Sequence, residues 1–169
     1  MILPIVTYGH PVLHAPAKPV ETITAEVRTL IDDMFETMYA APGIGLAATQ
    51  VGVPLRVLVI DLSVGKQAGR QIHLINPVFV LREGGQHEDE GCLSVPGYTA
   101  RVHRDEHVIV EGLDRDGQPC RHAATGLLAR AFQHEIDHLD GRVYVDHLRG
   151  LKRQLILRGI AKQQRKGAW

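Results

Sequence analysis

Two histidines and a glutamate form the pattern H-E-x-x-H within the segment Gln133–Leu139. On an α-helix, residues four positions apart lie on the same face, so the imidazoles of His134 and His138 can reach one metal ion. Glu135 lies about 100° around the helix from His134, so its carboxylate can stand beside the ion without binding it. The pattern is a signature of metal-dependent hydrolases, in which the glutamate is the general base.

A third metal ligand must come from elsewhere, because a catalytic metal usually has three protein ligands and one open position. The downstream histidine found in one class of zinc proteases is absent, and Asp140 lies off the histidine face; Asp146 and His147 remain candidates. Upstream, Cys92 lies in a glycine-containing segment and offers a thiolate, which binds metals strongly. On residues alone, Cys92 also fits simple core packing.

The segment Gly43–Gln50 carries two closely spaced glycines and matches G-x-G-x-x-A. A dinucleotide site needs a strand before the glycines and a helix after them. Here a helix is predicted before them, and Gly52 and Pro54 prevent a full helix after them, so a nucleotide site is excluded. The glycines instead favour close approach of the backbone to a ligand. Gln50 has an amide that can donate two hydrogen bonds, or it is an ordinary exposed polar residue.

Two predicted helices position these segments. The first begins at Thr24, ends at Pro42-Gly43 and has one apolar face, formed by Val27, Leu30, Ile31, Met34 and Met38. The second begins after Thr125 and stops at Gly141. Its core-facing residues are Leu128, Phe132, Ile136 and Leu139. His134 and His138 fall on the opposite side with Leu127 and Ala131, so they are not needed to fill the core, which favours a metal site.

Strands are predicted for the middle of the chain. The two apolar runs are Arg56–Leu62 and His73–Leu81, and Asn76-Pro77 favours an edge position for the second. Arg82–Glu90 is polar and is predicted to be a loop. A β-ribbon is expected from Thr99–His103 and His107–Leu113, followed by a hairpin turn at Asp114–Gly117 and a strand at Gln118–Ala123. Cys120 and His122 are interpreted as structural residues.

Composition indicates one domain spanning residues 1–169, without a net charge that would suggest nucleic acid. Residues 1–20 are rich in proline and are expected to form an extended arm. No secretion signal or membrane-spanning run is recognisable, so we expect a cytoplasmic protein that binds neither membranes nor DNA directly.

The segment Asp146–Lys166 is predicted to be helical apart from Gly150 and Gly159. Leu148, Leu151 and Leu155 share a face that should dock on the domain. The same face continues with the basic residues Arg158, Lys162 and Lys166, and no acidic residue comes after His147. This end is either a solvated tail or a docking surface for an acidic or RNA-rich partner.

Three segments together resemble the signature motifs of the peptide deformylase family, in order and spacing: Gly43–Gln50, Glu90–Ser94 and Gln133–Leu139. The resemblance extends from His10 to Gln154. It implies an α+β fold in which antiparallel or mixed sheets pack around the H-E-x-x-H helix, with an N-terminal and a C-terminal helix. It also implies removal of the formyl group from the formyl-methionine of nascent polypeptides.

The resemblance further implies a role for each residue. Cys92, His134 and His138 would bind the metal, and its water would attack the formyl carbon while Glu135 serves as general base and then acid. Gln50 and the backbone N–H of Leu93 would stabilise the oxyanion, and Gly45 would let the peptide lie close. Residues proposed for the methionine pocket are Ile44, Leu127 and Ala131.

The ligand types and the family resemblance imply different metals. A cysteine and two histidines suit zinc by ligand type, whereas the family resemblance implies Fe²⁺, for which Zn²⁺, Ni²⁺ or Co²⁺ may substitute. The resemblance also implies that the basic C-terminal helix, about residues 147–169, docks on the ribosome. Glu88 places a charge where an apolar residue is expected near the methionine pocket, and Arg130 places one beside the metal-binding face of the helix.

Two other classes compete with this hypothesis. An H-E-x-x-H endopeptidase would take a further ligand from downstream, and the downstream histidine typical of one protease class is absent. A binding module with a structural metal would need a fourth ligand at suitable spacing, and none is recognisable.

Overall fold

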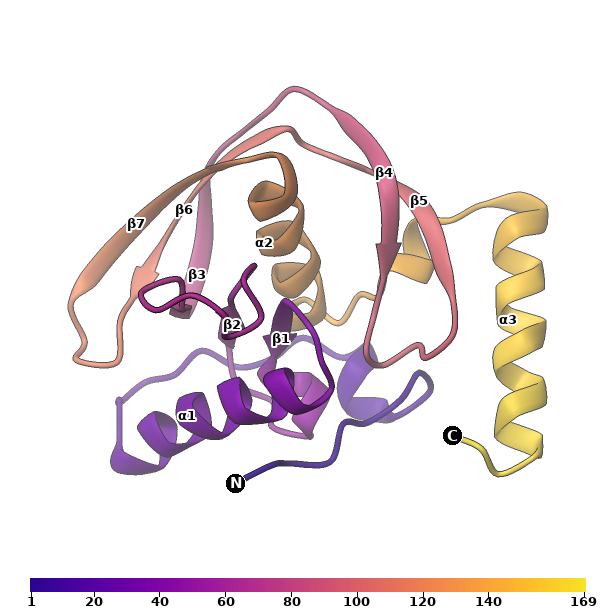
Figure 1. Cartoon of the computed structure of the whole chain (residues 1–169), viewed down its shortest axis with the longest axis horizontal. Coiled ribbons are helices and arrows are strands. Elements are labelled where there is room, and N and C mark those ends of the chain that lie inside the picture. Colours follow the sequence, from indigo (N-terminus) through magenta and orange to yellow (C-terminus); the bar gives the residue numbers. More distant parts are fainter.

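The structure is a computed structural model that describes all residues from 1 to 169. Helix α2 (Gly126–Leu139) lies between two β-sheets, as Figure 1 shows. Helices α1 (Ala25–Ala40) and α3 (Gly150–Arg165) lie outside them. The α+β prediction, with a central H-E-x-x-H helix and a helix towards each end of the chain, is confirmed. None of the helices has the length and apolar character needed to cross a membrane.

The larger sheet has the strand order β1-β2-β3-β6-β7, and every neighbouring pair is antiparallel. Its strands are β1 (Gly45–Ala47), β2 (Val57–Ile60), β3 (Ile72–Glu83), β6 (His107–Leu113) and β7 (Pro119–Thr125). One face packs on α2 through a core that includes Leu58, Leu74, Val110, Phe132 and Ile136. The other side of β1 and β2 packs on α1 through Val57, Val59, Ile31 and Met34.

The smaller sheet contains only β4 (Gln86–Gly91) and β5 (Thr99–Arg104). The prediction of a loop at Arg82–Glu90 is therefore wrong, because most of this polar segment is a strand with exposed side chains. The predicted ribbon between Thr99–His103 and His107–Leu113 is also wrong. The first segment pairs with β4 and the second with β3 and β7. The hairpin turn between β6 and β7 is confirmed.

The prediction of an edge position for β3 is wrong as well, since β3 lies between β2 and β6. Its ladder is interrupted between Ile75 and Val78, where Asn76 has a φ of 54°. This irregularity accommodates Pro77, which has no N–H to donate. The Asn76 side chain accepts from the N–H of Val20 and donates to its carbonyl, at 2.8 and 2.9 Å.

The predicted starts of α1 and α2 are both confirmed, and the two helices are capped differently. Thr24 Oγ1 accepts from the N–H of Val27 at 3.4 Å. Thr125 precedes α2 without a side-chain cap, and the N–H of Gly126 is bound instead by Glu106. Gly141 comes after α2 with a φ of 80°, the left-handed conformation typical of a residue after a helix.

Three single turns complete the chain: η1 (Pro11–His14), η2 (Ala48–Val51) and η3 (Tyr144–His147). The N-terminal arm is extended apart from η1 and passes below α2 in Figure 1. Helix α3 packs on the body through Ile156 and Ile160, which are almost fully buried. Of the predicted docking face, Leu148 is buried in the same cluster, whereas the prediction is wrong for Leu151 and Leu155, which are 68% and 53% exposed.

Candidate metal centre

Three possible metal ligands converge at the junction of α2 and the turn after β4. Cys92 Sγ lies 3.2 Å from His138 Nε2, which lies 3.2 Å from His134 Nε2. All three ligand atoms lie within 4.8 Å of one another, and no other such group of three occurs in the chain. Segments far apart in sequence thus supply one thiol and two imidazoles that face a common point.

The other candidates for a third ligand are engaged elsewhere. Asp140 pairs with Arg56 at 2.9 Å. Asp146 accepts from the N–H of Val143 at 2.9 Å, and His147 contacts Asp137 at 2.7 Å. None of them lies in the group around His134 and His138.

The donor set fits a divalent metal ion. Thiolate and imidazole are ligands that zinc and iron accept. Burial lowers the pKa of His138 well below its usual value and keeps the ring neutral, the form that binds metals. Burial also opposes a charge on His134, but Glu135, Cys92 and Glu90 outweigh it and raise the pKa of His134. The acidic groups around His134 therefore favour positive charge beside that ring.

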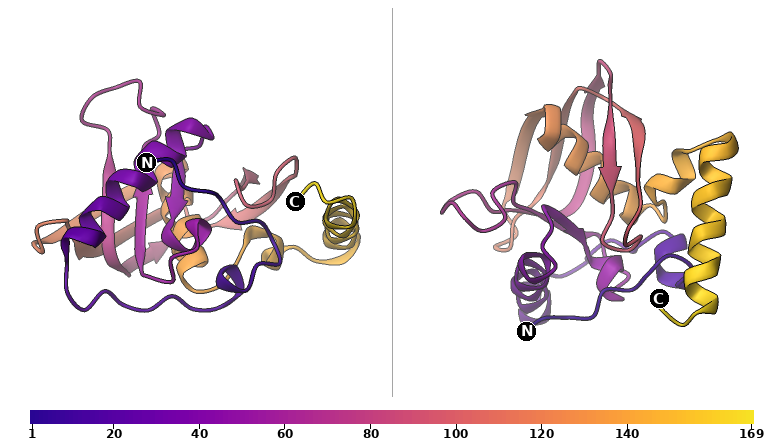
Figure 2. Two further views of the ribbon diagram at one scale, coloured as in Figure 1. Left: turned by 90° about the horizontal axis from the view of Figure 1, so that it is seen from below. Right: turned by 45° about the vertical axis from the view of Figure 1, so that its right-hand side comes forward.

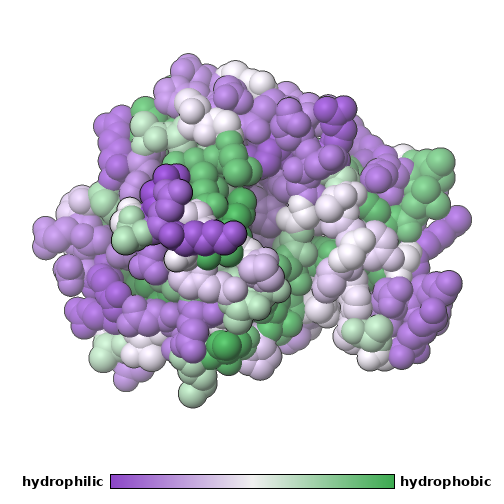
Figure 3. Space-filling view, viewed as in Figure 1, coloured by the Kyte–Doolittle hydropathy of each residue, from purple (hydrophilic) through white to green (hydrophobic).

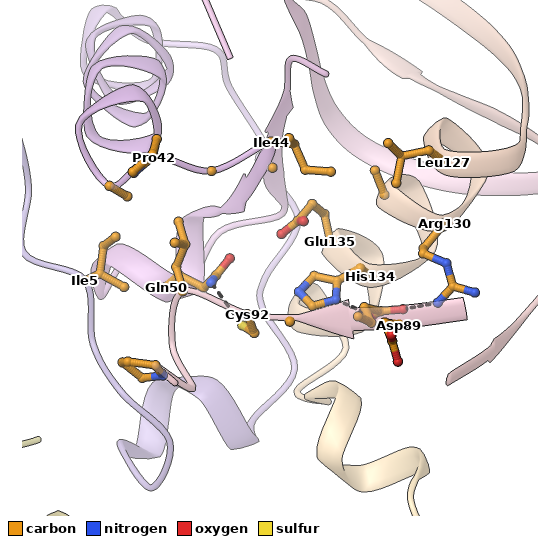
Figure 4. Close-up of a pocket in the computed structure, with 18 of the residues that line it drawn as sticks. Ile5, Pro42, Ile44, Gln50, Asp89, Cys92, Leu127, Arg130, His134 and Glu135 are labelled. Carbon is orange, nitrogen blue, oxygen red and sulfur yellow. Dashed lines mark hydrogen bonds and ion pairs between the residues drawn. The ribbon is translucent and has the colours of Figure 1, made fainter. Parts of the chain in front are cut away.

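Glu135 lies beside these ligands with its carboxylate almost fully buried. Burial raises the pKa of Glu135 to about 7, and its Oε1 has no hydrogen-bond partner within the chain. In Figure 4 the carboxylate points into the cavity, next to the His134 ring. A Cβ on Gly45 would overlap Glu135 Oε2, so glycine at this position of β1 lets the carboxylate keep its place. The arrangement suits a carboxyl that exchanges a proton near neutral pH.

Gln50 is buried, so its interpretation as an exposed polar residue is excluded. Its Oε1 accepts from the N–H of Ala47 at 3.0 Å, which orients the amide. Its Nε2 donates to Ser94 Oγ at 3.2 Å and makes a long contact of 3.5 Å with Cys92 Sγ. The backbone N–H of Leu93 has no acceptor within the chain. The Gln50 amide therefore lies beside the sulfur of Cys92, and the next residue in the chain carries an unpaired N–H.

A buried ionic cluster supports His134 from behind, and the sequence did not reveal it. His134 Nδ1 contacts Glu90, and Glu90 also binds Arg104 and Arg130 at 2.6 Å each. Burial acts to raise the pKa of Glu90, but the hydrogen bonds from His134 and Arg104 outweigh it and hold that pKa well below its usual range. Glu90 therefore stays ionised and fixes the ring so that Nε2 faces the other ligands.

Two weak signals in the sequence point to this cluster. Glu90 directly precedes the glycine before Cys92, and Arg130 stands within a stretch of small and apolar residues. The prediction that Arg130 places a charge beside the metal-binding face of the helix is confirmed, because Arg130 lines the cavity with Ala131 and His134. Its guanidinium is bound to Glu90, to Gln86 and to the Val102 carbonyl. Glu88 is exposed and is not part of the cavity wall.

An open cavity of about 710 Å³ reaches two of the three ligands, Cys92 and His134. Ile44, Leu127 and Ala131 line it, as predicted, together with Gly45, Gln50, Leu93, Cys92, His134 and Glu135. Apolar side chains surround a hollow in the middle of the face seen in Figure 3, with hydrophilic residues around them. Leu127 is 53% exposed and forms part of the rim. The cavity suits an extended ligand with an apolar side chain.

Comparison with known proteins decides the family. The chain matches the family model of polypeptide deformylase over residues 2–154.

The chain belongs to the peptide deformylase family.

A peptide deformylase of Acidobacterium capsulatum is 52% identical over 169 residues, which is 100% of this chain and 99% of that protein. A peptide deformylase crystal structure from Legionella pneumophila superposes with a TM-score of 0.93 and 46% identity, covering 99% of this chain and 98% of that one. A peptide deformylase from Ehrlichia chaffeensis, solved in complex with actinonin, has a TM-score of 0.89, 40% identity and coverage of 97% and 98%.

Family and fold identify this protein as an enzyme of the peptide deformylase family, as the three motifs predicted. The binding-module and endopeptidase hypotheses are set aside. The group of Cys92, His134 and His138 indicates a metal centre for this enzyme.

Proposed function

We propose that this protein removes the formyl group from the N-terminal formyl-methionine of nascent polypeptides and releases formate. One observation carries the proposal: Cys92, His134 and His138 converge beside the buried carboxyl of Glu135, at the end of an open cavity. Family membership adds the reaction to which these groups are suited.

Proton transfer is the task of Glu135. Cys92, His134 and His138 would hold a divalent cation, which would supply a nucleophile by lowering the pKa of a water from about 15.7 towards 7. Glu135 accepts the proton that this water loses and later delivers it to the leaving amine. The free Oε1 and the pKa of about 7 support both directions of transfer.

Negative charge that develops on the formyl oxygen is stabilised by two donors. These are the unpaired N–H of Leu93, the residue after Cys92, and the Gln50 amide, which lies 3.5 Å from Cys92 Sγ. The Ala47 N–H holds the Gln50 carbonyl, so the amide nitrogen is directed towards the cavity. Fixed donors of this kind typically contribute about 10²–10³ in kcat each.

The substrate enters as an extended strand. Gly45 leaves room for peptide backbone at the cavity wall, and the methionine side chain occupies the apolar surface of Ile44, Leu127 and Ala131. The cavity is open at the rim near Leu127, so residues after the methionine extend into solvent. Specificity therefore rests on the formyl group and on the first side chain.

Fe²⁺ is the metal that we propose, with Zn²⁺, Ni²⁺ or Co²⁺ as substitutes. A soft thiolate beside two imidazoles accommodates each of these ions, so ligand type alone does not select one. The family resemblance favours Fe²⁺. Metal analysis of protein purified without oxygen tests this choice.

The decisive experiment is formate release from a formyl-Met peptide by protein loaded with Fe²⁺ without oxygen. An acetyl-Met peptide of the same sequence is the matched control and should not react. Glu135→Ala should keep its metal and lose at least about two orders of magnitude in rate, the usual scale for loss of a general base. If metal-loaded protein releases no formate, the proposal is wrong.

We also propose that the enzyme acts in the bacterial cytoplasm on chains at the ribosome, which α3 contacts. Arg158 and Lys162 lie on its exposed side with Leu155, and this face can meet an RNA-rich surface. Truncation is a poor test, because Ile160 is buried against the body. Replacing Arg158 and Lys162 by Glu should weaken co-sedimentation with ribosomes and spare activity on short peptides. Unchanged sedimentation contradicts the contact.

A further inference from the structure

The C-terminal helix packs directly on the turn that comes after Cys92. Gly159 faces the ring of Tyr98 so closely that a Cβ on Gly159 would lie 2.8 Å from Tyr98 Cζ. Trp169 meets the same ring edge to face, with ring centroids 6.3 Å apart. Ile156 and Ile160 are buried in one cluster with Val95, Ala100 and Tyr144. Thus α3 is seated on the segment between Cys92 and Tyr98.

A second connection runs through the N-terminal arm. Gln164 Nε2 donates to the Tyr8 carbonyl at 2.8 Å, and the N–H of Tyr8 donates to the Ser94 carbonyl at 2.9 Å. Ser94 in turn contacts the side chains of Cys92 and Gln50. Its N–H lies 3.4 Å from Cys92 Sγ, and its hydroxyl accepts from Gln50. Figure 2, right, shows α3 running alongside the arm and the end of the β4–β5 sheet.

The turn itself has few bonds that fix its position. Its one internal backbone hydrogen bond joins the N–H of Val95 to the Cys92 carbonyl at 3.0 Å. Pro96 and Gly97 line the cavity, where no secondary structure holds them. His134 and His138, by contrast, are held by a regular helix. The position of the thiol relative to the imidazoles therefore depends on the residues that pack behind the turn.

We propose that Tyr98 and Gly159 are positioning residues for the metal centre. The contact between them seats α3 on the Cys92 turn and keeps the thiolate where it completes the set with His134 and His138. The retention of the metal then depends on α3, a helix that supplies no ligand. This inference rests on the proposed function only in taking these three residues as metal ligands.

The test uses the full-length protein loaded with Co²⁺, whose thiolate absorption band reports the bond to Cys92. Four variants are compared with the unaltered chain: Gly159→Ala, Tyr98→Leu, the double variant and the control Gln154→Ala, an exposed position on α3. Loss of Co²⁺ to excess chelator is monitored at the thiolate band. Unfolding temperatures of the metal-free proteins and formate release are measured in parallel.

Gly159→Ala should lose Co²⁺ about tenfold faster and shift the thiolate band, as expected when support behind a ligand is disturbed. Tyr98→Leu should also lose it faster. The double variant should be no faster than Tyr98→Leu, because both changes act through one contact. Gln154→Ala should match the unaltered chain. Since alanine is the better helix former, Gly159→Ala should raise the unfolding temperature if no clash occurs, and a lowered temperature supports the contact.

Co²⁺ loss from Gly159→Ala at the original rate, with an unchanged band, overturns the proposal, and so do additive effects in the double variant. Should Gly159→Ala not fold, Tyr98→Leu alone decides, because it introduces no clash. If the variants behave as expected but no formate is released, the proposed function fails and this inference stands. If formate is released and all variants keep Co²⁺ equally, only this inference fails.

Discussion

Arg130 Nη1 lies 2.6 Å from Glu90 Oε2, and the two side chains are only 4% and 5% exposed. The same carboxylate binds Arg104 and contacts His134, so one buried anion joins two cations to a metal ligand. Such a pair contributes little by its mere presence, because removing both charges from water is costly. Removing Arg130 is different, since it leaves Glu90 buried with only part of its compensation, from Arg104 and His134.

Arg130→Met should therefore destabilise the protein by about 1–3 kcal/mol, less than the loss of a buried charge's sole partner, because Arg104 still binds Glu90. Urea unfolding of the metal-free proteins measures this. Arg82→Met is the control, because the pair between Arg82 and Asp105 is half exposed and should contribute less than about 1 kcal/mol. Equal effects of the two substitutions would contradict the role assigned to burial.

Gly45→Ala should lower kcat by about 10²-fold or more while the metal stays bound. The added methyl group overlaps Glu135 Oε2, so the carboxyl must leave the position from which it exchanges protons. Steady-state kinetics and metal content measure both effects. In the Glu135→Ala background the same substitution should cost little more, because the group that it displaces is gone. A further loss of kcat of similar size would show that Gly45→Ala acts on a group other than Glu135.

Cys92 and Cys120 are both half-buried free thiols. Cys120 is therefore a matched control for metal binding by Cys92. Addition of Co²⁺ or Zn²⁺ at about 100 times Kd should stabilise the unaltered protein by about 2.7 kcal/mol. Cys92→Ala should lose most of this gain, whereas Cys120→Ala should keep it. Thermal unfolding with and without the ion provides the measurement. A full response from Cys92→Ala would rule the thiol out as a ligand.

In the metal-free protein, Glu135 should make stability depend on pH. Burial raises the pKa of Glu135 to about 7, against 4.5 for the free side chain. Between these values the folded state holds a proton that the unfolded state releases, so stability falls as pH rises. The loss amounts to about 3 kcal/mol across the window, at about 1.4 kcal/mol per pH unit.

Glu135→Gln has no such proton to lose. The difference in unfolding free energy between the unaltered protein and this variant should therefore change between pH 4.5 and pH 7 and stay constant below pH 4.5. A difference that is constant across the window would show that burial does not hold the proton on Glu135. Bound metal should remove the effect, because a nearby cation favours the ionised carboxylate.

Helix periodicity predicted much of this molecule. The split faces of α2, with Phe132 and Ile136 in the core and His134 turned away, result from a step of about 100° per residue. Strand partners cannot be derived from the sequence in the same way, because pairing joins residues that are far apart. Thus β5 pairs with β4 rather than with β6, although only Asp105 and Glu106 separate it from β6.

The ionic cluster and the docking of α3 were missed for a related reason. Arg130 and Glu90 are charged residues that sequence alone assigns to the surface, and only the folded chain brings them together. On α3, Leu151 and Leu155 look like the docking face, whereas Ile156 and Ile160 are buried. Gly159 lies on the side of α3 that packs on the body. Because it has no side chain, this side of the helix can approach the Tyr98 ring.

Cys92 and His138 stand 46 positions apart, and strands β5, β6 and β7 all lie between them. An ion bound by both residues would cross-link the two ends of the segment from Cys92 to His138, as a disulfide does, for as long as the protein stays folded. A protease that cuts the turn between β6 and β7 would then produce two pieces that stay joined through the ion as well as through packing. Chelation would remove this cross-link, so resistance to fragmentation becomes a property of the bound metal.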